Sequence, residues 1–303
     1  MVAPESLDFP PLHCSLDRRL GDYYQDFSSA LILVKDGYHG GVGEDGIPWH
    51  RGGAARLRSP ITIAQYALAN LIAAGRGEER RSAVARTQLD WLVSNQEHSG
   101  PHAGCWAMRF DNPKYRWLTQ PWYSALASGN AISALLRGWQ TFEDERYREA
   151  ADSAYEGLHA DRAGASLLDR RDRELWYEEY PADQPLRVLN GHVYTLLGVL
   201  DYARVSGNGA AEERWSRAAS TTQANLERFD LGYWSAYELR WREPASVHYQ
   251  KNIHVPLLQI LGTLTGRREF MVVANRWQSY VTSVRSRLRL GLAARMHRWK
   301  PKP

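Results

Sequence analysis

Cysteine is scarce in this chain of 303 residues, which contains only Cys14 and Cys105. Neither belongs to a CxxC motif or to a His/Cys spacing typical of zinc sites. A disulfide framework or a structural zinc needs several such residues. The sequence therefore predicts neither a disulfide framework nor a metal site.

Long apolar runs are also missing. No run approaches the roughly 20 residues needed to span a bilayer. The N-terminus, MVAPESLDFPPLHCS, has Glu5 and Asp8 where a signal peptide would be apolar. We therefore expect a cytoplasmic protein with no membrane segment.

Phenylalanine is the minority aromatic, with 6 Phe against 12 Trp and 16 Tyr. Most aromatic side chains therefore carry an NH or OH group as well as a ring. Such residues suit a cleft that binds carbohydrate, because rings stack on sugar faces and polar groups bond hydroxyls. Composition alone favours the other interpretation, a core rich in Tyr and Trp.

Acidic residues are absent from residues 285–303, which hold seven basic residues. Subtracting these seven charges from the net +4 of the chain leaves −3 for the rest. A basic tail can bind nucleic acid or membrane, but a solvated C-terminus is its commoner meaning. We expect the solvated tail and no nucleic-acid partner.

An internal repeat predicts four helical hairpins. Each repeat has an apolar helix rich in small residues, a short break with Gly or acidic residues, and a more polar helix. The apolar helices are expected near residues 60–74, 122–140, 189–205 and 253–265. The polar helices superimpose without gaps, with Ala85, Ala151, Ala219 and Ala274 at one register and Leu92, Leu158, Leu226 and Val281 seven residues later.

Alternating inner and outer helices of this kind predict a mainly α fold, an incomplete (α/α) toroid of about four hairpins. Residues 1–58 are expected to form an extended or β-hairpin segment packed on the body. Residues 59–284 would form the toroid, and residues 285–303 the basic tail. No linker rich in Pro or Ser indicates a second independent domain.

Three long connections, residues 94–120, 169–188 and 229–252, are expected on the side of the cleft. Alternating segments within them are typical of short strands. Loops longer than about 15 residues in a compact domain are usually functional. These loops gather carboxylates, phenols and an arginine, which suit proton abstraction beside a carboxylate. A structural role is nevertheless the commoner meaning of such residues.

Five ordered motifs resemble those of the D-glucuronyl C5-epimerases. LWYEEYPADQPLRVLNGHVYTLLGVLDYA resembles the family's WYEEYP and VLNG stretch, and QPWYSALASGNAIS resembles its PGWYSAMAQGQAIS segment. PITIAQYAL, YWSAYELR and HYQKNIHVPLLQIL resemble the other three motifs. The matches keep the family's order and span about residues 23–280.

The resemblance implies an epimerase without a cofactor, which inverts C5 of D-glucuronic acid to give L-iduronic acid. Its substrate would be an acidic polysaccharide, a glycosaminoglycan of the heparosan or heparan sulfate type, and its assembly a homodimer. The motifs also imply catalytic positions, which are Glu179, Tyr180, Tyr237, Arg240 and Tyr249.

One motif departs from the family pattern. His254 follows Tyr249 by five positions instead of four, and Gln250 replaces the first histidine. The resemblance therefore implies a one-residue insertion directly after a predicted catalytic tyrosine.

Inversion at C5 requires one group to remove a proton from one face and another to return a proton to the opposite face. Glu179 and Tyr249 are predicted to be these groups. Ionising C5 beside a carboxylate places two negative charges on one sugar, which Arg240 and tyrosine hydroxyls are predicted to stabilise. A tyrosine near pKa 10 is a poor base unless a cation lowers its pKa, and Arg240 is expected to do so.

Substrate contacts are predicted beside these motifs, at Trp122, Tyr123, Tyr177, Glu178, Arg187, Asn190 and His254. Packing is at least as common a role for several of them, including the histidine. Two other functions stay open. One is a polysaccharide lyase or glycoside hydrolase on the same toroid, and the other is a non-catalytic uronan-binding protein.

Overall fold

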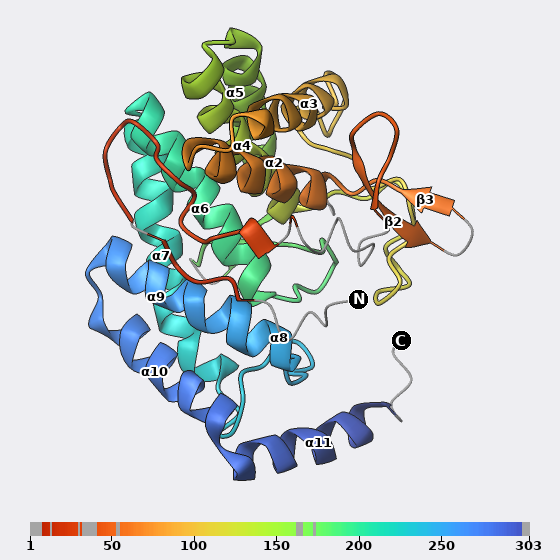
Figure 1. Cartoon of the computed structure of the whole chain (residues 1–303). Helices are drawn as coiled ribbons and strands as arrows, with labels where there is room; N and C mark the ends of the chain where they lie inside the picture. Colours follow the sequence, from red (N-terminus) through yellow and green to blue (C-terminus); the bar gives the residue numbers. More distant parts are fainter. Residues whose placement is uncertain are drawn as a thin grey trace.

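The fold is mainly helical, as predicted (Figure 1). A computed structural model describes residues 8–12, 14–29, 31, 41–52, 55–161, 166–171 and 174–298. Consecutive helices pack together in pairs, which are α2 (Pro60–Gly75) with α3 (Arg80–Ser94), α4 (Ala125–Phe142) with α5 (Glu145–His159), α6 (Leu189–Ser206) with α7 (Gly209–Phe229), and α9 (Val255–Thr265) with α10 (Arg268–Thr282).

Local signals set the ends of these helices. Pro60 occupies the first position of α2, where its missing N–H costs nothing. The side chain of Asn208 caps α7 by accepting a hydrogen bond from the Ala211 N–H at 3.1 Å. Gly207 and Gly266 end α6 and α9 in the left-handed conformation. Short turns follow, so each pair forms a hairpin.

The centre of the molecule is the contact between α4 and α6. A Cβ on Gly198 of α6 would lie 2.3 Å from the Gly129 carbonyl oxygen of α4, so only glycine permits this approach. Helix α4 also packs against α2. The eight register positions of the second helices are all buried, as the repeat predicts. Closure of the hairpins into a toroid stays a prediction.

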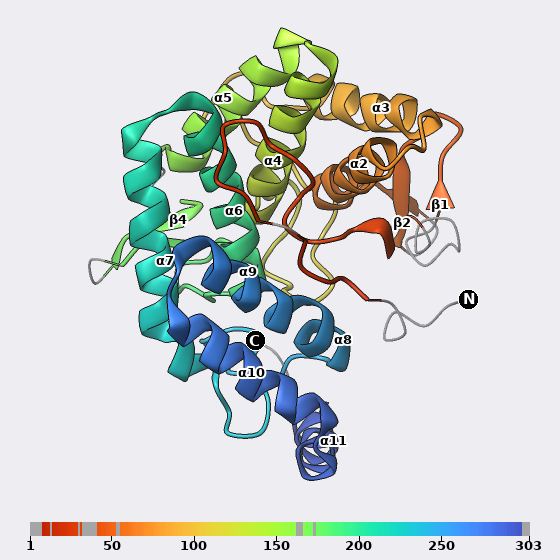
Figure 2. The ribbon, with the colours of Figure 1, turned by 60° about the vertical axis from the view of Figure 1, so that its left-hand side comes forward.

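The N-terminal segment crosses the inner helices as extended chain before it reaches a small sheet (Figure 2). Tyr24 donates a hydrogen bond to Asp201 at 2.7 Å, and Arg137 pairs with the same carboxylate at 2.6 Å. Strands β1 (Gly41–Val42), β2 (Pro48–Gly52) and β3 (Ala55–Leu57) then form an antiparallel sheet in that order. Residues 30 and 32–40 of the predicted N-terminal segment lie outside the described residues.

Short pairings stiffen the long connections, as their alternating pattern predicts. Strands β4 (Leu168–Asp169) and β5 (Trp176–Tyr177) pair antiparallel. A bridge joins Met108 of the first connection to Trp122, just after its end. Another joins Val188 to Glu238 and so links the second connection to the third.

The chain after the third connection differs from the expectation in two places. The last inner helix starts with α8 (Val247–Tyr249) and the π-helical η3 (Gln250–His254) before α9. The expected basic tail is helical as far as Arg298, in α11 (Val284–Arg298), which projects beyond the other helices (Figures 1 and 2). The side chains of Ser286 and Ala293 in this helix are buried, so one side of α11 is packed and not solvated. Residues 299–303 lie outside the described range.

No helix in the described part of the chain combines the length and the apolar character needed to cross a membrane.

Candidate active site

A cavity of about 630 Å³ lies where the long connections meet the inner helices. The first connection contributes Lys114 to its wall, the second Glu179 and Tyr180, and the third Tyr249. Trp122, which lies just after the first connection, also lines the cavity. The N-terminal segment and the start of α2 line its other sides. Tertiary structure therefore brings residues from three predicted loops to one site.

Glu179 is the buried acid of this cavity, with 3% of its surface exposed. Asn190, in the first turn of α6, donates a hydrogen bond to Glu179 Oε2 at 3.1 Å. Burial raises the pKa of Glu179 to about 7, although hydrogen bonds from Tyr180 and Asn190 and the charge of Lys114 lower it. A carboxyl with this pKa can accept or donate a proton near neutral pH.

Gly191 makes room for this acid. A Cβ on Gly191 would lie 2.4 Å from both Cβ and Oε2 of Glu179, closer than any real contact. The Asn190-Gly191 pair thus does two things at the start of α6. The Asn190 amide donates a hydrogen bond to the carboxylate, and the absence of a side chain on Gly191 lets the carboxylate approach the helix.

Three tyrosines accompany Glu179. Tyr180 is hydrogen-bonded to Glu179 and to Tyr237. The ring of Tyr237 lies 5.1 Å from that of Tyr249, edge to face. Burial, followed by the charge of Glu179, raises the pKa of both Tyr180 and Tyr237 well above 10. These two side chains therefore stay neutral phenols at physiological pH.

The π-helical turn η3 directly follows Tyr249, where the motif resemblance implies a one-residue insertion. The Val255 N–H donates to the carbonyl of Gln250, five residues back instead of four. A π turn holds one extra residue within an otherwise α-helical segment. His254 therefore remains beside Tyr249, with ring centroids 6.2 Å apart, despite the longer spacing.

Hydrogen bonds fix this turn. Gln250 is fully buried, accepts a hydrogen bond from the Ser235 N–H at 3.0 Å, and donates to the Trp277 carbonyl at 3.0 Å. Ser235 Oγ also lies 2.7 Å from His254 Nδ1. The Gln250 that replaces the family's histidine thus connects the third connection to α10.

The cations do not all reach the cavity. Arg240 is exposed and does not line it; its guanidinium lies 4.7 Å from the Trp241 ring and 6.0 Å from that of Trp117. Lys114 does line it, with Nζ 4.1 Å from the centre of the Tyr237 ring.

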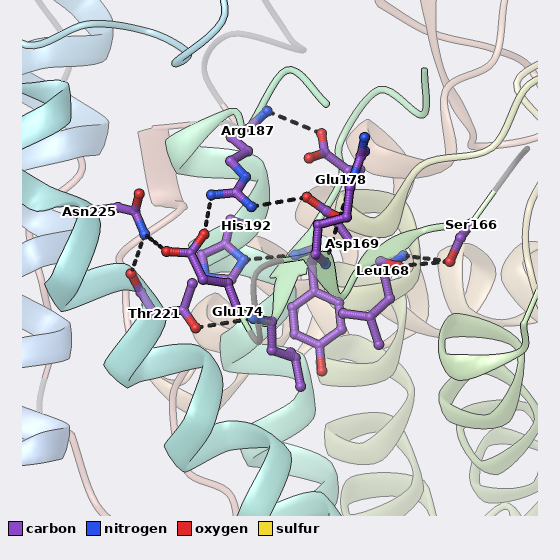
Figure 3. Close-up of polar contacts among 12 residues, drawn as sticks. Ser166, Leu168, Asp169, Glu174, Glu178, Arg187, His192, Thr221 and Asn225 are labelled. Carbon is purple, nitrogen blue, oxygen red and sulfur yellow. Dashed lines mark hydrogen bonds and ion pairs between the residues drawn. The ribbon is translucent and has the colours of Figure 1, made fainter. Parts of the chain in front are cut away.

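Arg187 links acidic residues of the second connection to one another (Figure 3). Its guanidinium bonds Asp169 at 3.1 Å and also Glu174, which accepts from Asn225 of α7 at 2.8 Å. The Arg187 N–H donates to Glu178 Oε2 at 3.2 Å. Neither Glu178 nor Arg187 lines the cavity, and together they anchor the chain on which Glu179 lies.

Three further predicted contacts also lie outside the cavity wall. Tyr123 stacks on His102 with ring centroids 3.7 Å apart. The Tyr177 hydroxyl is 2.9 Å from His159 Nε2, and His254 is fully buried. These side chains pack the walls from outside.

Trp122 and Asn190 are the predicted substrate contacts that line the cavity. The sequence analysis did not predict two roles. Gly191 provides the space in which Glu179 lies, and Gln250 fixes the π turn by its hydrogen bonds. The Asn-Gly pair was visible, but its meaning depends on which side chain packs against it. Within the described residues, no group of three or more His, Cys, Asp or Glu side chains is placed to hold a metal ion.

The sequence of the chain is similar to those of known proteins. The chain is 27% identical to the D-glucuronyl C5-epimerase of Caenorhabditis elegans over 229 residues, 69% of this chain and 36% of that protein. It is 26% identical to an uncharacterised protein of Methanocaldococcus jannaschii over 179 residues, 57% of this chain and 56% of that protein. The chain thus spans about a third to just over half of these relatives' lengths.

A family model for the C-terminus of D-glucuronyl C5-epimerase matches residues 99–279, which include most of the first connection, the whole of the other two and the cavity residues they contribute. Because the match covers more than half of the chain, the protein belongs to the D-glucuronyl C5-epimerase C-terminal family.

Proposed function

We propose that this protein inverts C5 of D-glucuronic acid units within an acidic polysaccharide, giving L-iduronic acid. The observation that carries the proposal is a buried carboxyl, Glu179, which shares one cavity with Tyr249 of α8. Family membership supports the same reaction.

Proton transfer to and from C5 divides between these two residues. The Glu179 carboxylate removes the C5 proton of glucuronate, since its pKa of about 7 makes it a competent base at neutral pH. The Tyr249 hydroxyl delivers a proton to the opposite face, and the reverse reaction exchanges the roles. Neutral Tyr180, which lines the cavity, donates a hydrogen bond that stabilises the developing enolate. Tyr237 does not line the cavity and acts through its hydrogen bond to Tyr180.

The finer features belong to the same proposal. A heparosan-type chain is the proposed polymer, and the four hairpins are proposed to form an incomplete toroid around the cavity. A homodimeric assembly is likewise a proposal, to be tested by the mass of the protein in solution.

Deuterium uptake at C5 tests the reaction. Glu179→Gln and Tyr249→Phe should each abolish inversion, by roughly 10²–10⁴-fold, while binding persists. Tyr249→Phe, which keeps Glu179, should still exchange the C5 proton of glucuronate units with deuterated solvent. Glu179→Gln, which keeps Tyr249, should exchange only from the iduronate side.

Other outcomes exclude this mechanism. Full epimerisation by either variant would remove that residue from the proton transfers. Chain cleavage by the wild-type protein would indicate a lyase or a hydrolase, and binding without exchange would indicate a uronan-binding protein.

A further inference from the structure

We propose that Lys114, rather than Arg240, is the cation that receives the carboxylate of the sugar unit being inverted. The cavity would thereby select a hexuronate over a neutral hexose. This inference rests on the proposed function and assigns a residue that the sequence motifs do not include.

Lys114 is the only lysine or arginine among the described residues that line the cavity. Its Nζ lies 4.1 Å from the Tyr237 ring centre and 5.1 Å from that of Tyr115, so two aromatic faces hold the ammonium. Glu243 Oε2 lies 3.4 Å away, and a third of the Lys114 side chain stays exposed. A substrate carboxylate can therefore approach this charge from the open side.

The backbone around Lys114 is fixed in advance. Asn112 Oδ1 accepts hydrogen bonds from the N–H groups of Lys114 and Tyr115, both at 2.9 Å. The Asn112 N–H donates to the Leu118 carbonyl at 2.9 Å, which closes the turn. Asn112 is itself buried and lines the cavity. The ammonium is thus presented by a rigid turn, which reduces the cost of binding.

The positive charge of Lys114 also interacts electrostatically with Glu179, the proposed base. Its charge lowers the pKa of Glu179 and that of Glu238. Removing the C5 proton adds negative charge next to the substrate carboxylate, and an ammonium in a partly dry cavity stabilises that charge. Arg240, stacked on Trp241 outside the cavity, does not have this position.

The binding test compares Lys114→Met with wild-type protein, using a heparosan oligosaccharide and the same oligosaccharide with its carboxyl groups reduced. Calorimetry should show that Lys114→Met binds the acidic oligosaccharide roughly 10- to 100-fold more weakly, the size of a lost charge-assisted hydrogen bond. Binding of the reduced oligosaccharide should not change. Lys114→Arg keeps the charge and should retain most of the affinity.

Arg116→Met is the matched control, because Arg116 is an exposed cation two residues further along the same loop. It should bind both oligosaccharides as the wild type does. Arg240→Met tests the competing assignment. Loss of affinity specific to the acidic oligosaccharide in Arg240→Met, with none in Lys114→Met, would overturn the inference.

The pH profile gives a readout that a structural role would not move. Without Lys114, the pKa of Glu179 should rise above about 7, so the acid limb of C5 exchange should shift to higher pH. An unshifted limb, together with unchanged binding, would reject Lys114. If the wild type exchanges no C5 proton on any glucuronan, the proposed reaction fails, and charge-selective binding still decides the role of Lys114. A wild type that binds neither oligosaccharide overturns both.

Discussion

Gly191 shows how a single atom can control the candidate site. It stands in the first turn of α6, where any Cβ would lie 2.4 Å from Glu179 Oε2. The carboxyl of Glu179 is almost fully buried and would lose its hydrogen bond from Asn190 if it moved aside. Position 191 therefore determines where the acid lies.

Gly191→Ala should reduce C5 exchange by about 10²-fold or more, the scale of a misplaced acid–base group. Overpacking should also cost about 1–3 kcal/mol of stability, measurable by urea unfolding. Gly209→Ala is the control, because Gly209 begins α7 and a Cβ there meets nothing within 4 Å. Equal activity of the two variants would contradict the role given to Gly191.

Glu179 should also set the pH dependence of the reaction. Burial raises its pKa to about 7, and the base that attacks glucuronate must be ionised. The rate constant kcat/KM should therefore rise tenfold per pH unit below about 7 and level off above it. Asn190→Ala removes a hydrogen bond that lowers this pKa, so the limb should move to higher pH. An acid limb near pH 4.5, the ordinary value for a glutamate, would show that Glu179 is not the base.

At the scale of the element, the π turn η3 lies between Tyr249 and α9 and holds one residue more than an α-helical turn would. The turn lies between Ser246, whose side chain caps α8 by accepting from the Tyr249 N–H at 3.2 Å, and Val255. Its one extra residue is accommodated locally.

Deleting Lys251 should therefore convert η3 to regular α-helix and leave epimerisation within a few-fold of wild type. Lys251 is the exposed residue of the turn, and its pair with Asp8 at 2.7 Å is a surface contact worth less than about 1 kcal/mol. Lys251→Ala controls for the lost ion pair. Deleting Gln259 within α9 should instead abolish folding, because it turns every later helix residue by about 100°. Loss of activity on deleting Lys251, with the fold retained by circular dichroism, would contradict this reading of η3.

At the scale of the whole molecule, one buried ion pair ties the N-terminal segment to the helical body. Asp201 is fully buried and binds Arg137 of α4, while Tyr24 of the N-terminal segment donates to the same carboxylate. Arg204 of α6 lies 3.4 Å from this acid. Three parts of the chain far apart in sequence thus share one negative charge.

Asp201→Ala should cost about 3–5 kcal/mol in the free energy of unfolding, because Arg137 would be left buried without its partner. Asp45→Ala breaks a 2.6 Å pair with Arg58 that is exposed, and should cost less than about 1 kcal/mol. Chemical denaturation of the two variants measures both values. Similar losses for both would show that burial does not matter for this pair.

Periodicity in the sequence was enough to predict the helices. The register of Ala85, Ala151, Ala219 and Ala274 predicted four buried positions, and all four are buried. This works because each hairpin buries one apolar face, and the spacing along the chain determines that face. Helix α11 at the basic end was not predicted, although Arg285, Arg287 and Arg289 are exposed there as expected of a solvated tail.

The sequence by itself determined the mainly helical fold, the family and the loops that carry Glu179 and Tyr249. Tertiary structure alone decided which residues face the cavity. Of the neighbours Glu178 and Glu179, only Glu179 lines the cavity, where it packs against Gly191 of α6. Glu178 instead accepts a hydrogen bond from the Arg187 N–H. Arg240 matched a motif yet lies outside, while Lys114 matched none yet lies inside. Motif spacing records order along the chain, whereas a cavity depends on the direction in which each loop turns its side chains.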